Sequence, residues 1–262
     1  MRRGELFWGG LLILLGALLL LKATGYLAGD VFSWFWPLFI MVLGIWLLAG
    51  GFGRRSRHVK TDKISILVLD AQRATLAVEH GAGELQLRSG ADPGDFLTGI
   101  SAVGMQHSEW RDGDRLLVRL ESGPSFIPVL GSEGGIWEFR LNRDIPIDLS
   151  FHSGASLLKL DLSDLLVTSL SFDGGATRLE VNLPARVQNS MVNLRAGAAH
   201  LEIIVPPGVA LRLRTRTIGH LDIDESRFPH LEQDLYQSID FDSAQHRADL
   251  TLDGGATTVR IQ

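Results

Sequence analysis

A glycine-rich turn that recurs about every twenty residues is the feature that most constrains the fold of this 262-residue chain. The pentapeptide DGGAT occurs at residues 173–177 and again at 253–257, and apolar residues occupy alternate positions before and after each copy. Alternation with a period of two around a turn is typical of a strand, a turn and a second strand. The repeat therefore predicts an all-β structure for the part of the chain that contains it.

Copies of the pattern lie elsewhere, each with a glycine shortly before alternating apolar residues. The leucines that follow these glycines, Leu158, Leu179, Leu201 and Leu221, are separated by 21, 22 and 20 residues. A more remote copy, LAVEHGAGELQL, lies further upstream. A period near 20 predicts a β-solenoid-like stack in which each rung packs its apolar side chains against its neighbours. We expect regular rungs over residues 149–262.

Each glycine-rich turn is interpreted as a corner of the coil. Glycine suits a corner either because the backbone needs a positive φ or because a Cβ would not fit there. Asp173 and Asp253 are expected to accept hydrogen bonds from backbone N–H groups at these corners. Calcium binding is the alternative interpretation of DGG, but the calcium-binding nonapeptide needs tandem G-G-x-G-x-D copies, which this chain lacks.

Two stretches of the chain depart from the period. Between Ile223 and Leu250 a polar insertion predicts a loop or an extra flap of strand beside the stack. Within residues 91–148, WRDGDRLLVRLE predicts a hairpin that turns at DGD, and IWEFRLNRDIPIDLSF predicts two extended strands. The Gly- and Pro-containing run at 121–135 predicts a long loop.

Two apolar runs without charged residues, at 6–21 and 31–52, precede the repeats. Because about 20 helical residues cross the core of a bilayer, they predict membrane spans over about 6–22 and 31–52. A cleaved signal peptide is the alternative for the first run. However, no small-x-small cleavage site follows it closely, and the second run begins within ten residues of Lys22.

The predicted organisation is a transmembrane helical hairpin at 1–53, a basic linker at 54–62 and a β-solenoid-like domain at 63–262. Lysine and arginine are concentrated outside the two ends of the hairpin, at Arg2, Arg3, Arg54, Arg55, Arg57, Lys60 and Lys63. Because cytoplasmic flanks carry this excess, we expect a multi-pass protein of the cell membrane with both termini and the β domain in the cytoplasm.

Neither the composition nor the motifs predict an enzyme. The chain has no cysteine, which excludes disulfides and thiolate metal sites, and its net charge of −5 argues against a nucleic-acid partner. It has no G-x-S-x-G, Walker or dinucleotide-binding glycine motif. The one S-x-x-K, Ser156–Lys159, lies in a predicted strand where the two side chains face opposite sides, and we interpret it as chance. We predict no catalytic, cofactor-binding or metal-ligating residue, and no cofactor.

The histidines invite a search for a metal site. His200 and His220 each precede a core leucine, so adjacent rungs would stack them about 5 Å apart. His80 and His152 precede other corners. A surface ladder is the preferred interpretation, because no carboxylate or cysteine completes a ligand set at the required spacing. Mutual repulsion in such a stack would disfavour protonation of both imidazoles.

Acidic residues on one sheet face would suit polysaccharide cleavage, which uses paired carboxylates. The residues available for such a face are Asp161, Asp164, Glu180, Glu202, Asp222 and Asp224. Three of them, Glu180, Glu202 and Asp222, share one repeat position, next to an inward leucine. Alternation requires polar residues at that position, so we interpret them as the outer cover of a half-buried sheet.

The hairpin carries a resemblance to a known family. A short apolar helix, a loop containing T-G-Y-L, and then W-P-L-F-I-M-V-L-G-I-W-L-L followed by arginines occupy residues 4–58. This arrangement resembles the LiaI/LiaF-type transmembrane region of bacterial cell-envelope stress proteins. The rung pattern is similar to the toast-rack and LiaF C-terminal β-domain families. The resemblance implies a non-enzymatic regulatory or sensory protein that contacts a membrane histidine kinase or sister membrane proteins.

Two other functions stay open beside this one. A bactofilin-like structural scaffold would be attached to the lipid bilayer and would form homo-oligomers through the ends of the solenoid. Its support is the final segment TTVRIQ, which would leave an open strand edge for assembly if it formed the last rung. A membrane-bound enzyme is the third hypothesis, and no motif supports it.

Overall fold

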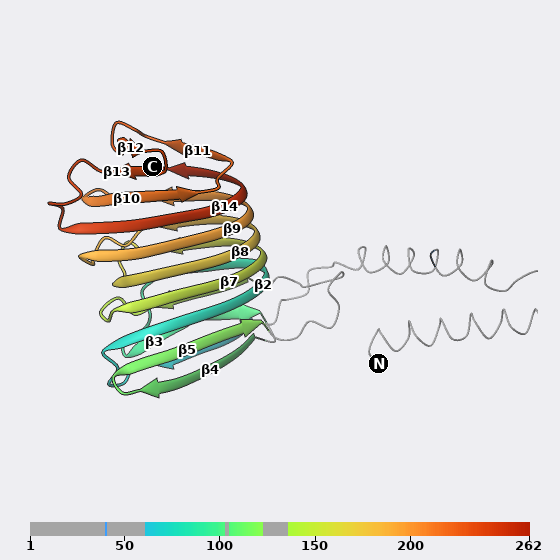
Figure 1. Cartoon of the computed structure of the whole chain (residues 1–262). Helices are drawn as coiled ribbons and strands as arrows, with labels where there is room; N and C mark the ends of the chain where they lie inside the picture. The colour runs from blue at the N-terminus through green and yellow to red at the C-terminus, as the bar shows by residue number, and fades with distance from the viewer. Residues whose placement is uncertain (1–39, 41–60, 103–104, 123–135) are drawn as a thin grey trace, which may run out of the picture. The chain divides into compact units, whose positions relative to one another are not determined.

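The structure, a computed structural model, is an all-β domain (Figure 1). It describes residues 61–102, 105–122 and 136–262, together with Ile40. The chain divides into two compact units, Met1–His58 and Val59–Gln262, and all the described strands lie in the second. The all-β, stacked-strand architecture predicted from the repeats is thereby confirmed.

Fourteen strands form one folded sheet in the described part of the chain. They are β1 (Thr61–Leu67), β2 (Arg73–Ser89), β3 (Asp95–Ala102), β4 (Met105–Asp112), β5 (Arg115–Ser122), β6 (Ile136–Leu141), β7 (Ile147–Asp161), β8 (Val167–Asn182), β9 (Asn189–Ile204), β10 (Val209–Arg216), β11 (His220–Ile223), β12 (His230–Glu232), β13 (Leu235–Gln237) and β14 (His246–Ile261). The predicted spans at 6–22 and 31–52, and residues 123–135 of the predicted loop, lie outside the described residues. Within those limits, no helix is both long and apolar enough to cross a membrane.

Five long strands, β2, β7, β8, β9 and β14, form the body of the domain. Each runs along one side, bends near its middle and returns along the other side, so the sheet has a first limb before the bends and a second limb after them (Figure 1). Neighbouring long strands pair in parallel and in register on both limbs. The upstream copy LAVEHGAGELQL lies in β2, so the regular rungs begin earlier than the predicted residue 149.

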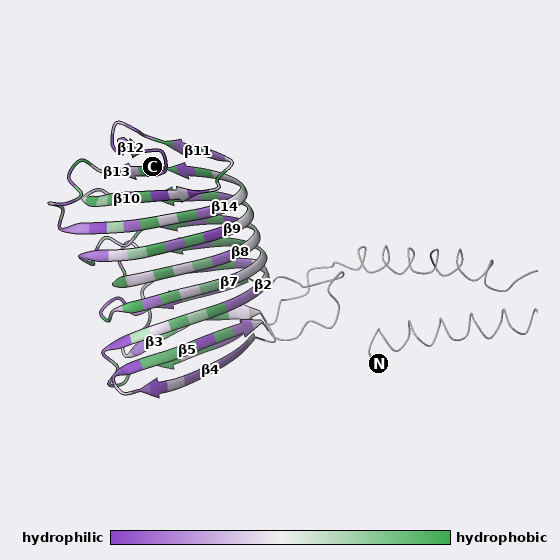
Figure 2. Cartoon of the chain, in the orientation of Figure 1, coloured by the Kyte–Doolittle hydropathy of each residue, from purple (hydrophilic) through white to green (hydrophobic). Residues whose placement is uncertain are grey.

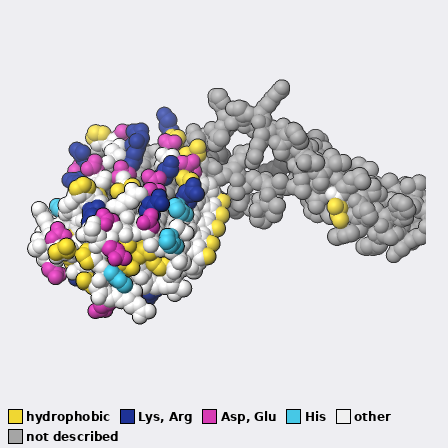
Figure 3. Space-filling view, turned by 90° about the horizontal axis from the view of Figure 1, so that it is seen from above, with side chains coloured by type: hydrophobic (Ala, Val, Ile, Leu, Met, Phe, Trp, Pro, Cys, Tyr) yellow, Lys and Arg dark blue, Asp and Glu magenta, His cyan; other side chains and the backbone are white. Residues whose placement is uncertain are grey.

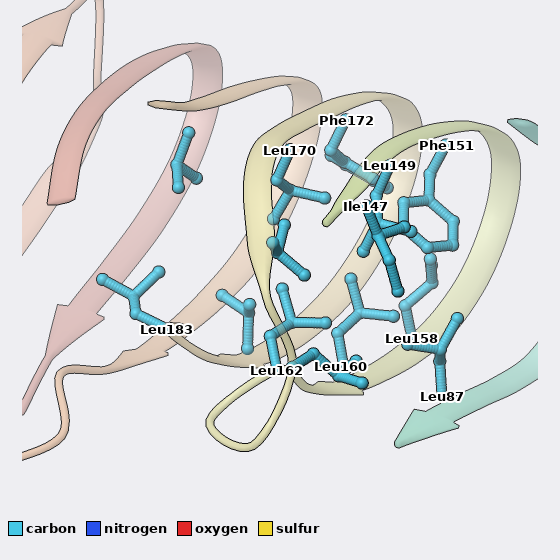
Figure 4. Close-up of a cluster of buried hydrophobic side chains, with 14 of the residues drawn as sticks. Leu87, Ile147, Leu149, Phe151, Leu158, Leu160, Leu162, Leu170, Phe172 and Leu183 are labelled. Atoms are coloured by element: carbon cyan, nitrogen blue, oxygen red, sulfur yellow. The ribbon is translucent and has the colours of Figure 1, made fainter. Parts of the chain in front are cut away.

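The core lies between the two limbs. Hydrophobic and hydrophilic residues alternate along the long strands (Figure 2), and the hydrophobic ones are largely buried. In the second limb Leu158 lies opposite Leu179, which lies opposite Leu201, and all three are buried. Leu149 and Leu170 of the first limb belong to the same cluster (Figure 4). Burying each leucine contributes about 1.5–3 kcal/mol, so the stacked rows of apolar residues fix the register of the rungs.

The order of the rungs differs from their order in the sequence. The last strand, β14, lies between β9 on one side and β10 and β11 on the other. Val259 of β14 therefore pairs with both Leu201 and Leu221, and the predicted direct step from Leu201 to Leu221 is wrong. After β11 the chain leaves the stack, forms the β12–β13 hairpin within the predicted insertion, and returns as β14.

Antiparallel strands extend the stack at both ends. At one end β4 and β5 form the predicted hairpin, which turns at Gly113 with a φ of 60°, and β1 and β3 continue the sheet beyond β6. At the other end β13 and β12 continue the sheet beyond β10. The segment TTVRIQ belongs largely to β14, which is paired on both sides, so the open edge predicted there does not exist.

Candidate functional site

Glycines form a ladder where the long strands bend. Gly81, Gly154, Gly175, Gly197 and Gly255 occupy this position in successive rungs. A Cβ on Gly154 would lie 2.6 Å from the carbonyl oxygen of Gly81, and one on Gly175 would lie 2.8 Å from that of Gly154. None of the five has a positive φ. At Gly154 and Gly175, lack of space for a Cβ is therefore the correct one of the two predicted reasons for glycine.

Each of the last four residues of DGGAT has a distinct position in the bend. Gly174 faces the ring of Phe172, where a Cβ would lie 2.5 Å from a ring carbon. Gly175 forms the ladder, and Ala176 is exposed on the outside of the bend. Thr177 turns back into the core and is only 5% exposed. The repeated pentapeptide thus serves the geometry of the corner, as its interpretation as a turn predicts.

The aspartates of the two pentapeptides lie in an outer row of the first limb. Arg195 stands between Asp173 and Asp253, and Arg216 follows Asp253. Among the described residues, neither aspartate side chain accepts a hydrogen bond from a backbone N–H, so their predicted capping role is wrong. Opposite charges on neighbouring strands attract one another, and this row therefore helps to hold the rungs in register.

The acidic residues at the shared repeat position form part of an outer row on the second limb. Glu180 follows Lys159 and precedes Glu202, and Arg260 then separates Glu202 from Asp222. The Nε atom of Arg260 donates to Oδ2 of Asp222 at 2.9 Å. These side chains cover the outside of the sheet, and the row mixes acidic with basic groups.

The remaining carboxylates of the predicted acidic set lie at the end of a strand, as Asp161 does in β7, or beyond one. Oδ1 of Asp161 accepts a hydrogen bond from the Ser163 hydroxyl at 2.7 Å. Oδ1 of Asp224 accepts one from the Ser226 hydroxyl at 2.6 Å, and this bond lowers the pKa of Asp224. Asp164 contributes its backbone carbonyl to the guanidinium of Arg186. The six carboxylates therefore do not converge on one point of a sheet face.

The histidines do not form the predicted stack. Thr258 of β14 separates His200 from His220, because β14 lies between the strands that carry them. The two imidazoles are thus two strand spacings apart, about 10 Å, and the prediction that they stack is wrong. His152 is exposed in the outer row of the first limb. In the described ranges no group of histidine and acidic side chains is arranged to hold a metal ion.

His80 is the exception among the histidines, because it is buried. Its ring meets that of Trp137 edge to face, with 4.7 Å between the ring centroids, and only 3% of the residue is exposed. Burial disfavours the charged imidazolium and lowers the pKa of His80. His80 occupies the inward corner position that Gly174 and Ala196 occupy in later rungs. The structure thus places a neutral histidine in the core of the first rung.

The serine and lysine of the S-x-x-K sequence do not act on each other. Ser156 lies at the bend of β7 and its hydroxyl bonds to that of Ser153. Lys159 is exposed in the outer row next to Glu180. On the face of the domain that Figure 3 shows, acidic and basic side chains are interspersed. Where such a surface meets another macromolecule, complementary charges give the contact its specificity.

Two protein families match the chain. The N-terminal domain of toast rack, DUF2154, matches residues 55–204, and the LiaI-LiaF-like transmembrane region matches residues 6–48. The first match covers most of the solenoid, and the second associates the chain with a membrane. Neither description names an enzyme. No curated protein matches this chain.

Two solved structures are similar to the domain. A candidate cell adhesion protein from Clostridium sporogenes has a TM-score of 0.69 and 14% identity, over 77% of this chain and 98% of the other. This identity is low, and the match shows a shared fold alone. A candidate adhesin from Bacteroides fragilis has 6% identity over 78% of this chain and 97% of the other, but its TM-score of 0.18 carries no argument.

Proposed function

This chain belongs to the toast-rack family and carries a LiaI-LiaF-like transmembrane region, and from that premise we propose that it is a non-enzymatic regulator of the bacterial cell-envelope stress response. It acts by protein–protein contact beside the membrane. The observation that carries the proposal is the order of its parts: a matched transmembrane region is followed within a short linker by a rigid stack of strands.

The stack supports a contact mechanism because its inward side chains stabilise the fold and its outward side chains are exposed to a partner. Inward rows such as Leu158, Leu179 and Leu201 hold the rungs together, while outward rows are free to meet a partner. A rigid platform that presents rows of both charges gives specificity through electrostatic complementarity. The partner that the resemblance suggests is a membrane histidine kinase or a sister envelope-stress protein, and the kinase is modulated by this contact.

The proposed topology places both termini and the solenoid in the cytoplasm. Its support is the excess of lysine and arginine outside the two ends of the hairpin. The chain has no cysteine, so single cysteines can report their own location. Cysteines at Ser171 and Glu180 should resist a membrane-impermeant maleimide in intact cells and react after lysis. Reaction in intact cells would reverse the proposed orientation.

In vivo photo-crosslinking tests the partner. A photoreactive residue at Ser171 of the first limb or at Glu180 of the second should capture a membrane protein that mass spectrometry identifies as a kinase or a sister protein. The same residue at buried Leu179 is the matched control and should capture nothing. Two results together would contradict the proposal: the outward positions capture only lipid, and deletion of the chain leaves an envelope-stress reporter unchanged under all inducing conditions.

The bactofilin-like scaffold loses the feature that supported it. TTVRIQ is paired on both sides rather than open, and the short strands β12 and β13 extend the stack beyond β10. Size-exclusion chromatography of the full chain in detergent, at several protein concentrations, separates the two functions. A discrete species fits the regulator, whereas growth into filaments with concentration would favour the scaffold.

A further inference from the structure

A shallow hollow of about 480 Å³ lies on the outer face of the second limb, near the end formed by β1. It spans four neighbouring strands, β1, β3, β6 and β2. Its charged lining residues are Lys63, Arg88, Asp92, Glu138 and Arg140, and the hydroxyls of Ser65 and Thr98 also line it. Its volume falls in the range of pockets that hold small molecules.

Two arginines stand side by side in this hollow. Arg88 of β2 is directly opposite Arg140 of β6, and both are exposed. Like charges opposite each other on neighbouring strands repel. No ion pair to either guanidinium is found among the described residues, although the carboxylates of Asp92 and Glu138 line the same hollow. Within this part of the chain, the two guanidinium groups therefore lack the close ion pair that would offset their repulsion.

In a second pair of opposed arginines in the same sheet, carboxylates of the protein offset the repulsion between the guanidinium groups. Arg73 and Arg115 are also directly opposite each other. Arg73, however, bonds Asp114 at 2.9 Å, and Arg115 lies 3.7 Å from Asp148. The fold thus neutralises one arginine pair with its own carboxylates. Arg88 and Arg140 are exposed and have no ion-pair partner among the described residues.

The other residues of the hollow indicate which functional groups its ligand carries. Paired guanidinium groups bind the oxygens of phosphate in a bidentate manner, and Lys63 adds a third positive charge. Thr98 is only 8% exposed and adds a hydroxyl to the lining of the hollow. Asp92 and Glu138 would repel a bare phosphate, but carboxylates accept hydrogen bonds from hydroxyl groups. A ligand that carries both a phosphate and hydroxyls satisfies both sets.

We propose that this hollow binds the phosphate ester of a small polyol, with the phosphate on Arg88 and Arg140 and the hydroxyls on Glu138 and Asp92. Two sources present this chemistry: a soluble glycerol phosphate and the phosphoglycerol headgroup of an anionic lipid. The length of chain between the matched transmembrane region and Lys63 is compatible with binding of the lipid headgroup. Lys63 follows the matched transmembrane region by fifteen residues, and these span at most about 50 Å.

Arginine labelling of the full chain in phosphatidylcholine nanodiscs tests the proposal. Phenylglyoxal modifies exposed guanidinium groups, and mass spectrometry reads each arginine separately. Millimolar glycerol 3-phosphate should slow the labelling of Arg88 and Arg140 at least fivefold and leave Arg73, Arg178 and Arg195 unchanged. Glycerol, and sodium chloride at matched ionic strength, are the controls and should protect neither arginine.

Variants test the roles of the arginine pair and of Glu138, and a second lipid identifies the source of the phosphate ester. Arg140→Gln should abolish the protection of Arg88, whereas Arg115→Gln, in the compensated pair, should leave it intact. Glu138→Gln should remove the preference for glycerol 3-phosphate over inorganic phosphate. If discs that contain phosphatidylglycerol protect the two arginines without added ligand, the source is the lipid; if only the soluble ester protects them, it is the soluble metabolite. Absence of protection in both arms, or equal protection of Arg178 and Arg195, overturns the proposal.

Discussion

The glycine ladder provides a graded test of the corner. Replacing Gly154 by alanine puts a Cβ 2.6 Å from the carbonyl oxygen of Gly81, and replacing Gly175 puts one 2.8 Å from that of Gly154. Real Cβ atoms do not approach this closely, so the rungs must separate or the bend must shift. At Gly197 and Gly255 the same substitution gives 3.3 and 3.2 Å, which a small relaxation accommodates.

The magnitude follows from two opposing terms. Overpacking a well-packed site costs about 1–3 kcal/mol. Alanine also restricts the unfolded chain relative to glycine, which stabilises the fold by about 0.4–1 kcal/mol where the backbone conformation is compatible. None of these glycines has a positive φ, so the second term applies to all of them. We expect Gly154→Ala to lose about 1–2 kcal/mol, Gly175→Ala slightly less, and Gly197→Ala and Gly255→Ala to lie near zero.

Urea unfolding of the detergent-solubilised chain, followed by far-ultraviolet circular dichroism, measures these differences. Gly197→Ala is the matched control, because it makes the same chemical change at the same position of a neighbouring rung. Equal destabilisation at all four glycines would refute the reasoning, because the cost would then come from the loss of glycine itself rather than from the space between rungs.

Three further predictions follow from other parts of the domain. Because burial lowers the pKa of His80, the unfolded chain takes up the proton near pH 6.5 and the folded chain only at lower pH. The free energy of unfolding should therefore decrease below about pH 6.5, by at most about 1.4 kcal/mol per pH unit. In urea titrations at several pH values, His80→Phe should reduce this dependence on pH. Arg260→Glu places four acidic residues in one outer row and should cost about 1 kcal/mol in 50 mM salt and less in 500 mM, since the ion pair with Asp222 is exposed. Removal of residues 246–262 takes away an internal rung, so the circular dichroism and protease resistance of the whole domain should change; loss of one terminal rung alone would contradict the observed strand order.

The corners and the inward rows could be predicted because both are local properties of the sequence. Alternation along each strand predicts that Leu179 and Leu201 are buried, regardless of which strands lie beside them, and the glycines mark each bend. The order of the rungs is not local. Leu221 and Val259 are both apolar and both follow a glycine, so either can stack on Leu201 without loss of burial.

Charge was the signal that could have decided the order. Stacking β11 directly on β9 would put Asp222 beside Glu202, and like charges on neighbouring strands repel. Insertion of β14 puts Arg260 between them instead, and it also places Asp253 between Arg195 and Arg216. Opposite charges on either side of β14 favour the observed order, whereas the apolar pattern alone does not distinguish it from the sequential order.

The hollow with Arg88 and Arg140 could not be predicted from the sequence. Arg88 lies in a regular rung, but Arg140 lies in β6, outside the period, and nothing in the sequence brings the two together. Once they are opposed, the missing carboxylate partner is visible only by contrast with Arg73 and Arg115, whose charges Asp114 and Asp148 compensate. In a domain whose inward rows secure the fold, an outer arginine pair that lacks an ion-pair partner among the described residues costs stability and contributes no packing, which is why we assign it to recognition.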